Sequence, residues 1–422
     1  MKPAALILFF ILPAAAFCQA PWYAPQRADI VIPPPGQPAD TLDSCPKLNA
    51  LKADAGYSDA PAAKEVAEVD AAKLPLPADD LERAGIIEVL KTDLDYWDSR
   101  PDSAKIQLGP DTYDAPRLRR TTKALLEIFS ADMPAEELLN TLKSRFRIYR
   151  ASADDGTGKT VITGYYEAEI AVTKKPDETH KYAVHLKPAD LVKTTPAMGV
   201  DFDYGRYDEN GRLAPHYSRA EIHAGLLGGQ GLEIVWSAHP SQIMLLQIQG
   251  SGVLRFPDGD YARAGFDGAN GRPFRSVQKI LMDCGEIPAM SFKDFIKYLS
   301  AQGPREQRLA DLNPRYIFFQ SRPKDSRPYG AIGRVLTPGR SIAIDPKYVP
   351  LGLFGLLRSK RPAAQGGGLT FRDFNRFIAT HDTGSAIRGP GRVDLFWGTG
   401  AIAETEASSM KALGELYLFI SK

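Results

Sequence analysis

Three aspartates near the C-terminus stand in short frames rich in Gly or Pro, a setting in which carboxylates can perform proton chemistry. They are Asp345 in IDPKYVPLG, Asp382 in THDTGSAIRG and Asp394 in GRVDLFWGTG. An apolar run typical of a strand precedes or surrounds each aspartate, which predicts that the carboxylates lie at strand ends. A single Asp beside Gly or Pro is most often an ordinary turn residue. Three of them in one compact segment favour a carboxylate site in a small β-barrel.

Other motifs precede these frames, and glycine recurs in several of them. They include TGYYEAEI (residues 163–170), a long run with QIQGSG (residues 247–252) at its centre, GANGRPFRSVQKILMDCGEIP, and NPRYIFFQ (residues 313–320). Together with the aspartate frames, and in this order, they resemble the membrane-bound lytic murein transglycosylase A family, which cleaves the glycan strands of bacterial cell walls and has a C-terminal three-aspartate domain. The resemblance is nearly continuous from about residue 160 to the C-terminus. It is far more specific than a lone DTG or GSG.

The resemblance implies a mainly β fold with N-terminal helices, in which a split double-psi β-barrel domain carries a second β-rich domain as an insertion. A groove between the two domains would suit an extended sugar strand, since binding sites often lie at domain interfaces. The predicted division is a signal peptide at 1–20, a Pro/Ala-rich tether at 21–78, N-terminal helices and the first part of the barrel domain at 79–169, the inserted domain at 170–312, and the second part of the barrel domain at 313–422.

The resemblance also implies a reaction. Lytic transglycosylases cleave the β-1,4 bond between N-acetylmuramic acid and N-acetylglucosamine in peptidoglycan and leave a 1,6-anhydromuramic acid end. Ordinary glycosidases use two carboxylates, about 5 to 9.5 Å apart. Here the 6-hydroxyl of the muramic acid is an internal nucleophile, so one carboxylate can act first as acid and then as base. Such an enzyme is a carbon–oxygen lyase acting on a polysaccharide, and it consumes no water.

Asp394 matches the position of the family's catalytic residue and is the predicted general acid and base. A free Asp titrates near pH ~3.9, so this role needs a raised pKa. The Leu-Phe-Trp run that follows Asp394 would supply apolar surroundings, and Asp382 would supply a like charge. Asp382 and Asp345 are the predicted supporting residues. Each has a structural alternative, a turn within THDTG for Asp382 and an anchored loop within DPKYVPLG for Asp345.

The predicted substrate-binding residues come from motifs on both sides of the groove. Tyr165 and Tyr166 point to opposite faces of a regular strand, so at most one of them can face the sugar. Trp397 suits stacking on a sugar ring and a core position equally well. Ala168 stands where the family often has proline, which leaves the path of this segment and any role for Glu167 open. The full set is Tyr165, Tyr166, Gln249, Gly250, Ser251, Gly252, Gly384, Ala386 and Trp397.

Length and composition agree with a soluble globular enzyme. The chain has 422 residues, of which 44% are apolar and 24% are charged, and this length allows two or three domains. A net charge of +1 gives no support for a nucleic-acid partner. The six histidines are scattered without metal-ligand spacing, so we expect no metal and no cofactor.

Two other functions compete with the enzyme. A secreted double-psi barrel without chemistry could bind and loosen polysaccharide, and an aspartate near an aromatic residue is compatible with that. The presence of all three aspartates together with QIQGSG argues against such a binder. A Ser or Cys hydrolase is disfavoured because the sequence has no G-x-S-x-G elbow and no nearby Cys and His pair.

The N-terminus reads MKPAALILFFILPAAAFCQA, which predicts a secretory signal cleaved after Ala20 and a periplasmic protein. Cys18 would carry the lipid in an outer-membrane lipoprotein, but the bulky Phe17 before it fits such a signal poorly. Cys45 and Cys284 would remain in the mature chain and could pair in an oxidising compartment, although nothing local supports the bond. Peptidoglycan is the predicted partner, while outer-membrane attachment and complexes for cell-wall synthesis or division stay open.

Helical patterns precede the β-rich part of the chain, and regular structure is predicted to begin at Asp80. The predicted helices span 81–96, 116–129 and 134–146. Further along, short alternating runs such as VITGYYEAEIAV, LEIVWSA and IMLLQIQGSGVLRF predict strands, with a few short helices between them. Ser218 with Glu221 predicts a capping box for one of these helices, and Ser291 predicts a cap for another.

Overall fold

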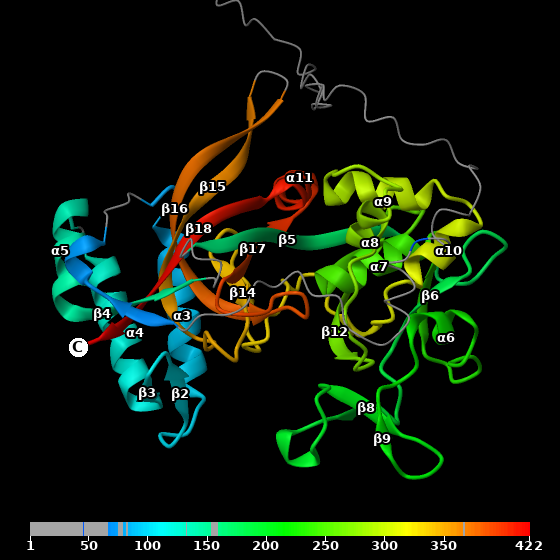
Figure 1. Ribbon diagram of the computed structural model, residues 1–422, viewed down its shortest axis with the longest axis horizontal. Coiled ribbons are helices and arrows are strands. Elements are labelled where there is room, and N and C mark those ends of the chain that lie inside the picture. The colour runs from blue at the N-terminus through cyan, green and yellow to red at the C-terminus, as the bar shows by residue number, and fades with distance from the viewer. Residues whose placement is uncertain are drawn as a thin grey trace, which may run out of the picture.

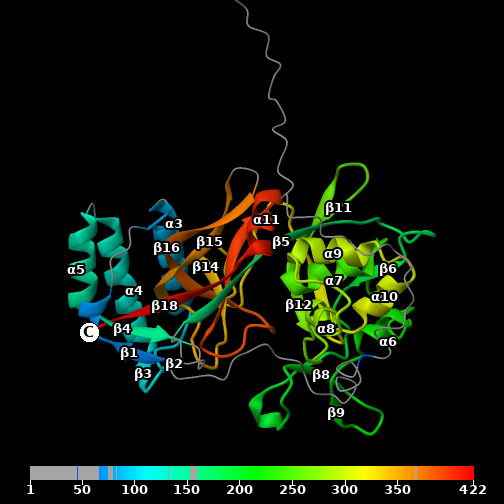
Figure 2. The same ribbon diagram turned by 45° about the horizontal axis from the view of Figure 1, so that its top comes forward.

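The computed structural model describes Cys45 and residues 66–74, 79–81, 83–131, 133–152, 159–365 and 368–422. The predicted signal peptide, Cys18 and most of the predicted tether lie outside the described residues. Two lobes lie side by side, one built around a barrel with helices on its outer face and one formed by the segment inserted into it (Figure 1, Figure 2). Strand β5 (Thr160–Ala171) runs from the first lobe into the second.

A six-stranded barrel forms the centre of the first lobe, and its strands come from both sides of the insertion. They are β5, β14 (Ser341–Ile344), β15 (Phe354–Gln365), β16 (Gly368–Thr383), β17 (Arg392–Thr399) and β18 (Lys411–Ser421). Neighbours follow the order β18, β15, β16, β14, β17, β5, and β18 also pairs with β5, which closes the ring. The β14/β16 and β17/β5 pairs are parallel, and the remaining pairs are antiparallel. The predicted mainly β fold with a barrel is confirmed.

The three predicted N-terminal helices are present, and they cover the outer face of the barrel. They are α3 (Ala84–Asp98), α4 (Ala115–Ser130) and α5 (Ala135–Arg145), and each of their ends lies within three residues of the predicted position. Leu90, Leu125 and Phe129 on these helices share a core with Phe354 and Phe377 of the barrel. The hairpin of β2 (Lys105–Leu108) and β3 (Asp111–Asp114) connects α3 to α4.

Regular structure begins before Asp80, which corrects the expectation from the sequence. Strand β1 (Ala67–Val69) pairs with β4 (Phe146–Ala151), which pairs in turn with β18, and η1 (Ala71–Lys73) follows β1. Val66 and Leu74 on either side of this segment are buried. These two apolar residues anchor it against the barrel lobe despite its Pro- and Ala-rich surroundings.

The inserted lobe mixes helices with strands, so the prediction of a β-rich insertion describes it only in part. Within residues 170–312, all of which the structure describes, five helices alternate with short strands. The helices are α6 (Arg219–His223), α7 (Pro240–Gln249), α8 (Val277–Asp283), α9 (Phe292–Ser300) and α10 (Arg305–Ala310). The other elements are β6 (Tyr182–His185), β7 (Val192–Lys193), η2 (Pro196–Met198), β8 (Tyr204–Tyr207), β9 (Leu213–Ala214), β10 (Glu233–Ser237), β11 (Ser251–Arg255) and β12 (Tyr261–Ala269).

Helix α7 replaces part of a predicted strand. Residues 243–249 of the IMLLQIQ run are helical, and the chain becomes extended only from Ser251 onwards. Most side chains of this run are buried, so no amphipathic period distinguishes a helix from a strand there. The predicted caps are confirmed, because Ser218 and Glu221 form the capping box of α6 and Ser291 caps α9.

Strand β5 also organises the sheet of the inserted lobe. Its second half pairs in parallel with β11, and β12 and β13 (Ile317–Arg322) extend this sheet. The buried Glu167 on β5 accepts hydrogen bonds from Arg263 of β12 (2.5 Å) and from Thr399 at the end of β17 (2.8 Å). It therefore ties the two lobes together, which gives Glu167 a structural role.

A disulfide joins Cys45 to Cys284, 239 positions apart, and settles the pairing that the sequence left open. Its two sulfurs lie beside the main core of the inserted lobe, where Cys45 is buried. No helix in the described part of the chain combines the length and apolar character that a membrane span requires.

Candidate active site

Asp394 lies in the middle of β17, beside its parallel neighbour Thr163 on β5. The Thr163 hydroxyl donates a hydrogen bond to Oδ1 of Asp394 at 2.7 Å. Oδ2 of Asp394 accepts no hydrogen bond from any described residue. Burial raises the pKa of Asp394 to about 6, and the nearby Asp382 charge adds to this rise, while the Thr163 hydrogen bond and Arg392 act against it. A carboxylic acid with this pKa can both give up and take back a proton near neutral pH.

Asp382, near the end of β16, uses both of its carboxylate oxygens. Oδ2 accepts from the Tyr165 hydroxyl at 2.8 Å, and Oδ1 accepts from the backbone N–H groups of Ala331 and Thr383, each at 2.9 Å. Burial raises the pKa of Asp382 above its ordinary value. Asp382 thus orders three chain segments and supplies a negative charge near Asp394.

Asp345 follows β14 and holds two loops together. Its Oδ1 accepts from the backbone N–H of Lys347 at 3.1 Å, and its Oδ2 accepts from that of Gly389 at 2.8 Å. The side chain is buried, so it offers little surface to a substrate. These contacts support the structural alternative for Asp345.

A small pocket between the two lobes has Asp394 in its wall and a volume of about 80 Å³. The barrel lobe contributes Asp394 and the loop from Gly384 to Ile387. The inserted lobe contributes Arg219, Gln247, Ile248, Phe274, Asn313, Arg315 and Ile317. Of the residues predicted for the site, the pocket brings together Asp394, Gly384 and Ala386. The other two aspartates are absent from its wall.

Comparisons with known proteins point to one family. Residues 161–320 match the model described as the MltA specific insert domain, and residues 340–420 match the 3D domain. Membrane-bound lytic murein transglycosylase A of Vibrio cholerae is 29% identical over 268 residues, which cover 62% of this chain and 66% of that protein. The protein of the same name from Escherichia coli K12 is 27% identical over 270 residues, or 63% and 66% of the two chains. The chain belongs to the membrane-bound lytic murein transglycosylase A family.

Solved structures share this fold. A membrane-bound lytic murein transglycosylase from Agrobacterium tumefaciens is 25% identical with a TM-score of 0.68, over 85% of this chain and 98% of that one. Escherichia coli MltA with bound chitohexaose is 20% identical with a TM-score of 0.62, over 87% and 97% of the two chains, a likeness of fold alone. The chain spans 66% of the length of the curated relatives that it matches. Their activity and substrate therefore come to this member of the family as proposals.

The tyrosine pair faces two different cores in this family member, in agreement with the alternation of a regular strand. Tyr165 packs beside Phe396 and donates to Asp382. Tyr166 lies in the core of the inserted lobe, where its hydroxyl donates to Glu404 at 3.4 Å and its backbone N–H donates to Gln249 at 3.0 Å. Both tyrosines are buried and neither lines the inter-lobe pocket.

The glycines of QIQGSG have backbone roles. Gly250 has φ of 79° and ends helix α7 in the left-handed conformation, which glycine adopts without steric cost. A Cβ at Gly252 would lie 2.6 Å from the carbonyl oxygen of Ala168, so glycine permits the close pairing of β11 with β5. Ala168 lies inside the unbroken strand β5, which answers the question of its path. Ser251 begins β11 and is partly exposed, outside the pocket wall.

Trp397 packs between the cores of the two lobes. Its indole occupies the space where a Cβ on Gly164 would lie, with Nε1 only 2.4 Å from that position. Because side chains alternate along β17, Trp397 faces the opposite side from Asp394. The geometry favours the core alternative over sugar stacking.

Several residues that line the pocket or contact Asp394 were not predicted from the sequence. Thr163 opens the TGYYEAEI motif, but its contact with Asp394 depends on a parallel pairing across 231 positions. Arg219, Phe274 and Arg315 reach the pocket from loops and short elements of the inserted lobe. Arg315 belongs to the NPRYIFFQ motif, yet nothing local indicates that it shares a pocket with a carboxylate of the other lobe.

A buried chain of hydrogen bonds runs through Ser341, His381 and Asp93. The Ser341 hydroxyl lies 2.9 Å from Nδ1 of His381, and Nε2 of His381 lies 3.1 Å from Oδ1 of Asp93. These residue types form the triad of serine hydrolases. All three residues are fully buried, so the serine cannot reach a substrate. The chain instead links helix α3 to β14 and β16 next to Asp382.

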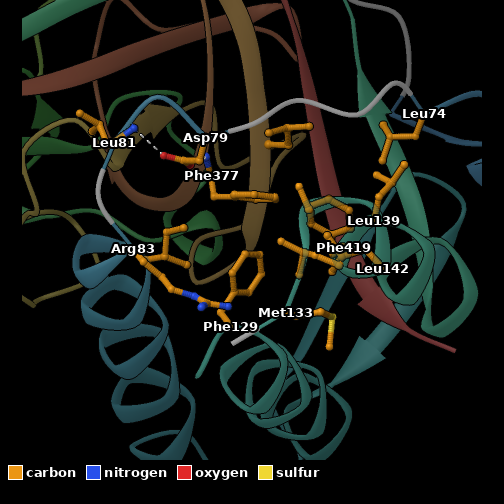
Figure 3. A pocket seen from close by; sticks show the side chains of 14 residues that line it. Leu74, Asp79, Leu81, Arg83, Phe129, Met133, Leu139, Leu142, Phe377 and Phe419 are labelled. Atoms are coloured by element: carbon orange, nitrogen blue, oxygen red, sulfur yellow. Dashed lines mark hydrogen bonds between the residues drawn. The ribbon is translucent and has the colours of Figure 1, made fainter. Parts of the chain in front are cut away.

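A larger, apolar pocket of about 220 Å³ lies elsewhere, between the N-terminal helices and the barrel. Figure 3 shows Phe129, Leu139 and Phe419 around it, with Asp79 at its edge. Asp79 is engaged in an ion pair with Arg340. This pocket therefore has no free catalytic carboxylate among the described residues that line it. In the described part of the chain, no group of three His, Cys, Asp or Glu residues is arranged to hold a metal ion.

Proposed function

We propose that this protein is a lytic transglycosylase that cleaves the β-1,4 bond between N-acetylmuramic acid and N-acetylglucosamine in peptidoglycan, with Asp394 as its single acid and base. One observation carries the proposal. Of the three aspartates, Asp394 alone lines the pocket between the lobes, and its pKa is raised to about 6. Its Oδ2 atom accepts no hydrogen bond from the described residues and is therefore available for proton transfer.

The reaction would proceed in two proton transfers through the same carboxyl group. Protonated Asp394 donates to the bridging oxygen, the bond from that oxygen to C1 of the muramic acid breaks, and N-acetylglucosamine leaves with a free 4-hydroxyl. The Asp394 carboxylate then takes the proton of the muramic acid 6-hydroxyl as that oxygen bonds to C1. The internal nucleophile benefits from proximity, for which effective molarities of about 10⁵ M or more are known. Asp394 ends protonated, as it began.

The other two aspartates support Asp394 in different ways. The charge of Asp382 helps to raise the pKa of Asp394, and its hydrogen bonds hold the Tyr165 side chain and the Ala331 loop in place. Asp345 fixes the backbone at Gly389, within the segment that connects the pocket loop to β17. In this proposal Asp382 tunes the acid, and Asp345 stabilises the loop that carries part of the pocket.

The finer architecture belongs to the same proposal. The closed ring with two parallel strand pairs supports a double-psi barrel. The entry of β5 into the inserted lobe and the start of β13 support the proposed domain boundaries near residues 170 and 312. We also propose a periplasmic location through the N-terminal signal, with peptidoglycan strands as the partner.

Digestion of purified murein sacculi separates this enzyme from a protein that only binds and loosens polysaccharide. Wild-type protein should release soluble muropeptides that end in 1,6-anhydromuramic acid and are one water lighter than hydrolytic products. Asp394→Asn protein should bind sacculi and release none. Release of reducing-end muramic acid as the main product would contradict the mechanism, and binding without release by the wild type would favour the non-catalytic alternative.

A further inference from the structure

The inserted-lobe wall of the pocket contains a buried cation, Arg219, which lies over the Tyr316 ring and is influenced by the charge of Asp311 but forms no ion pair with a described carboxylate. Arg219 is 1% exposed, and it donates from Nε to the Asn313 carbonyl at 3.0 Å and from Nη2 to the Arg315 carbonyl at 2.7 Å. Its Nη1 has no hydrogen-bond partner, and no described carboxylate forms an ion pair with it. Burial lowers the pKa of Arg219 to about 10, so it remains charged at neutral pH. Buried charges are normally paired, so this one indicates an anionic or strongly polar ligand.

Two neighbours in the same wall also have unused hydrogen-bonding capacity. Arg315 donates from Nη1 to the Arg272 carbonyl and pairs from Nη2 with the half-exposed Asp203 at 3.3 Å, while its buried Nε has no partner among the described residues. An ion pair of this length to an exposed carboxylate contributes little. Gln247 donates to the Ile317 carbonyl, and its Oε1 accepts no hydrogen bond within the described part of the chain. The wall therefore offers two guanidinium groups and an amide.

Apolar side chains lie next to these polar groups. Ile248, Phe274 and Ile317 line the same pocket, and Ile248 is 37% exposed on the surface of α7. Since the pocket volume of about 80 Å³ is well below the ~300–1,000 Å³ typical of whole-ligand sites, it fits a substituent better than a sugar ring. The substituent should combine an apolar carbon with an oxygen that accepts from arginine.

We propose that this wall binds the lactyl group on O3 of muramic acid and thereby distinguishes murein from chitin. The inference rests on the proposed function. The lactyl group has a methyl carbon for Phe274 and Ile248 and a carbonyl or carboxylate for Arg219 and Arg315. Chitin, a polymer of N-acetylglucosamine, has a bare hydroxyl at O3. Because Asp394 lies in the same pocket, the sugar whose C1 bond breaks would carry this group into the opposite wall.

Equilibrium binding by Asp394→Asn protein, which should not cleave its ligand, tests the inference. The ligands are chitohexaose and murein hexasaccharides of the same length, one with free lactyl carboxylates and one with stem peptides. We expect the carboxylate form to bind at least about 10-fold more tightly than chitohexaose, the ratio expected for one charge-assisted hydrogen bond. The peptide form, whose lactyl carbonyl is an amide, should lie between them.

Two further substitutions in this background locate the preference. Arg315→Gln should reduce the ratio of the two affinities to about 3 or less by weakening the carboxylate form alone, and Ile248→Ala should reduce the ratio about threefold. Ile248 is exposed, so its variant should fold even where Arg315→Gln does not. Arg212→Gln, the same change on an exposed turn of the inserted lobe, is the matched control and should leave the ratio unchanged.

The outcomes separate the inference from the function on which it rests. Equal binding of murein and chitin oligosaccharides, or equal weakening of both by Arg315→Gln and Ile248→Ala, would overturn the lactyl assignment and leave the transglycosylase proposal intact. Failure to bind any murein ligand, together with no anhydro products from the wild type, would overturn both.

Discussion

Strand β17 and the ends of β14 and β16 each present an aspartate, but they leave it in different states. Asp382 and Asp345 accept hydrogen bonds on both oxygens, largely from backbone N–H groups of loops. Asp394 accepts one hydrogen bond, from the Thr163 side chain, and lines the pocket. The difference shows that a carboxylate at a strand end becomes a loop anchor when backbone donors surround it. Asp394, which lies within the paired part of β17, keeps one carboxylate oxygen available for chemistry.

The largest effect should come from Asp394→Asn, which keeps the shape but cannot exchange a proton. General acid–base groups contribute ~10²–10⁴-fold, and in the proposed mechanism one residue serves both steps, so turnover should fall by about 10⁴-fold or more. Release of anhydro-muropeptides measures this, and Asp373→Asn, an exposed carboxylate on β16, is the matched control. Turnover near that of the wild type would move the acid's role to Asp382 or Glu167.

Measuring the stability of the same variant shows whether unfolding causes its loss of turnover. Burial raises the folded-state pKa of Asp394 to about 6, above the unfolded value. Protonated Asp394 therefore favours the folded state, and this contribution is full below pH ~4 and is lost as the pH rises through about 6. Asp394→Asn should consequently be at least as stable as the wild type toward urea at pH 7.

Asp382→Asn should have a smaller effect, about 10- to 100-fold on turnover, because it disturbs the surroundings of the acid but not the acid itself. Its charge raises the pKa of Asp394, so removing that charge should lower this pKa. The alkaline limb of the pH–activity profile should then move to lower pH. An unchanged pH–activity profile would mean that Asp382 acts only as a loop anchor. Asp382 and Asp394 would then have fully separate roles, one structural and one in proton transfer.

Thr163→Val tests the single hydrogen bond that Asp394 accepts and should shift the profile in the opposite direction. The Thr163 hydroxyl lowers the pKa of Asp394, so its loss should move the alkaline limb to higher pH. Turnover should fall about 3- to 10-fold, the range for one neutral hydrogen bond. Measuring this variant beside Asp382→Asn provides an internal control, since non-specific damage would not move the two profiles apart.

Asp345→Asn should have the smallest effect on activity, within about twofold when the protein is folded. Asparagine has a single acceptor oxygen, so one of the two loop N–H groups would lose its partner, at a cost of about 1–3 kcal/mol in the free energy of unfolding. Urea unfolding measures the loss. A large fall in turnover without a loss of stability would mean that Asp345 takes part in the reaction. It would contradict the assignment of Asp345 as a loop anchor.

Local patterns in the sequence were sufficient for the features that depend on neighbouring residues. The helices α3 to α5, the caps at Ser218 and Ser291, and the barrel strands around the aspartates follow from periodicity and short-range hydrogen bonding. The blocks of motifs in order predicted the family and selected Asp394 from three similar candidates. The IMLLQIQ run was misread because most of its side chains are buried, so too few face solvent to reveal its period.

Only the tertiary structure decided which distant residues meet. The pairing of β17 with β5 brings Thr163 to Asp394, and the packing of the two lobes places Arg219 and Arg315 in the same pocket as that carboxylate. The same packing turns Trp397 and Tyr166 into core residues and joins Cys45 to Cys284. Parallel strand pairing and disulfides between remote segments leave no local signal in the sequence. The residues around each partner have the same local pattern whether or not the distant partner is present. The sequence therefore predicted the proposed acid, and only the fold shows which residues surround it.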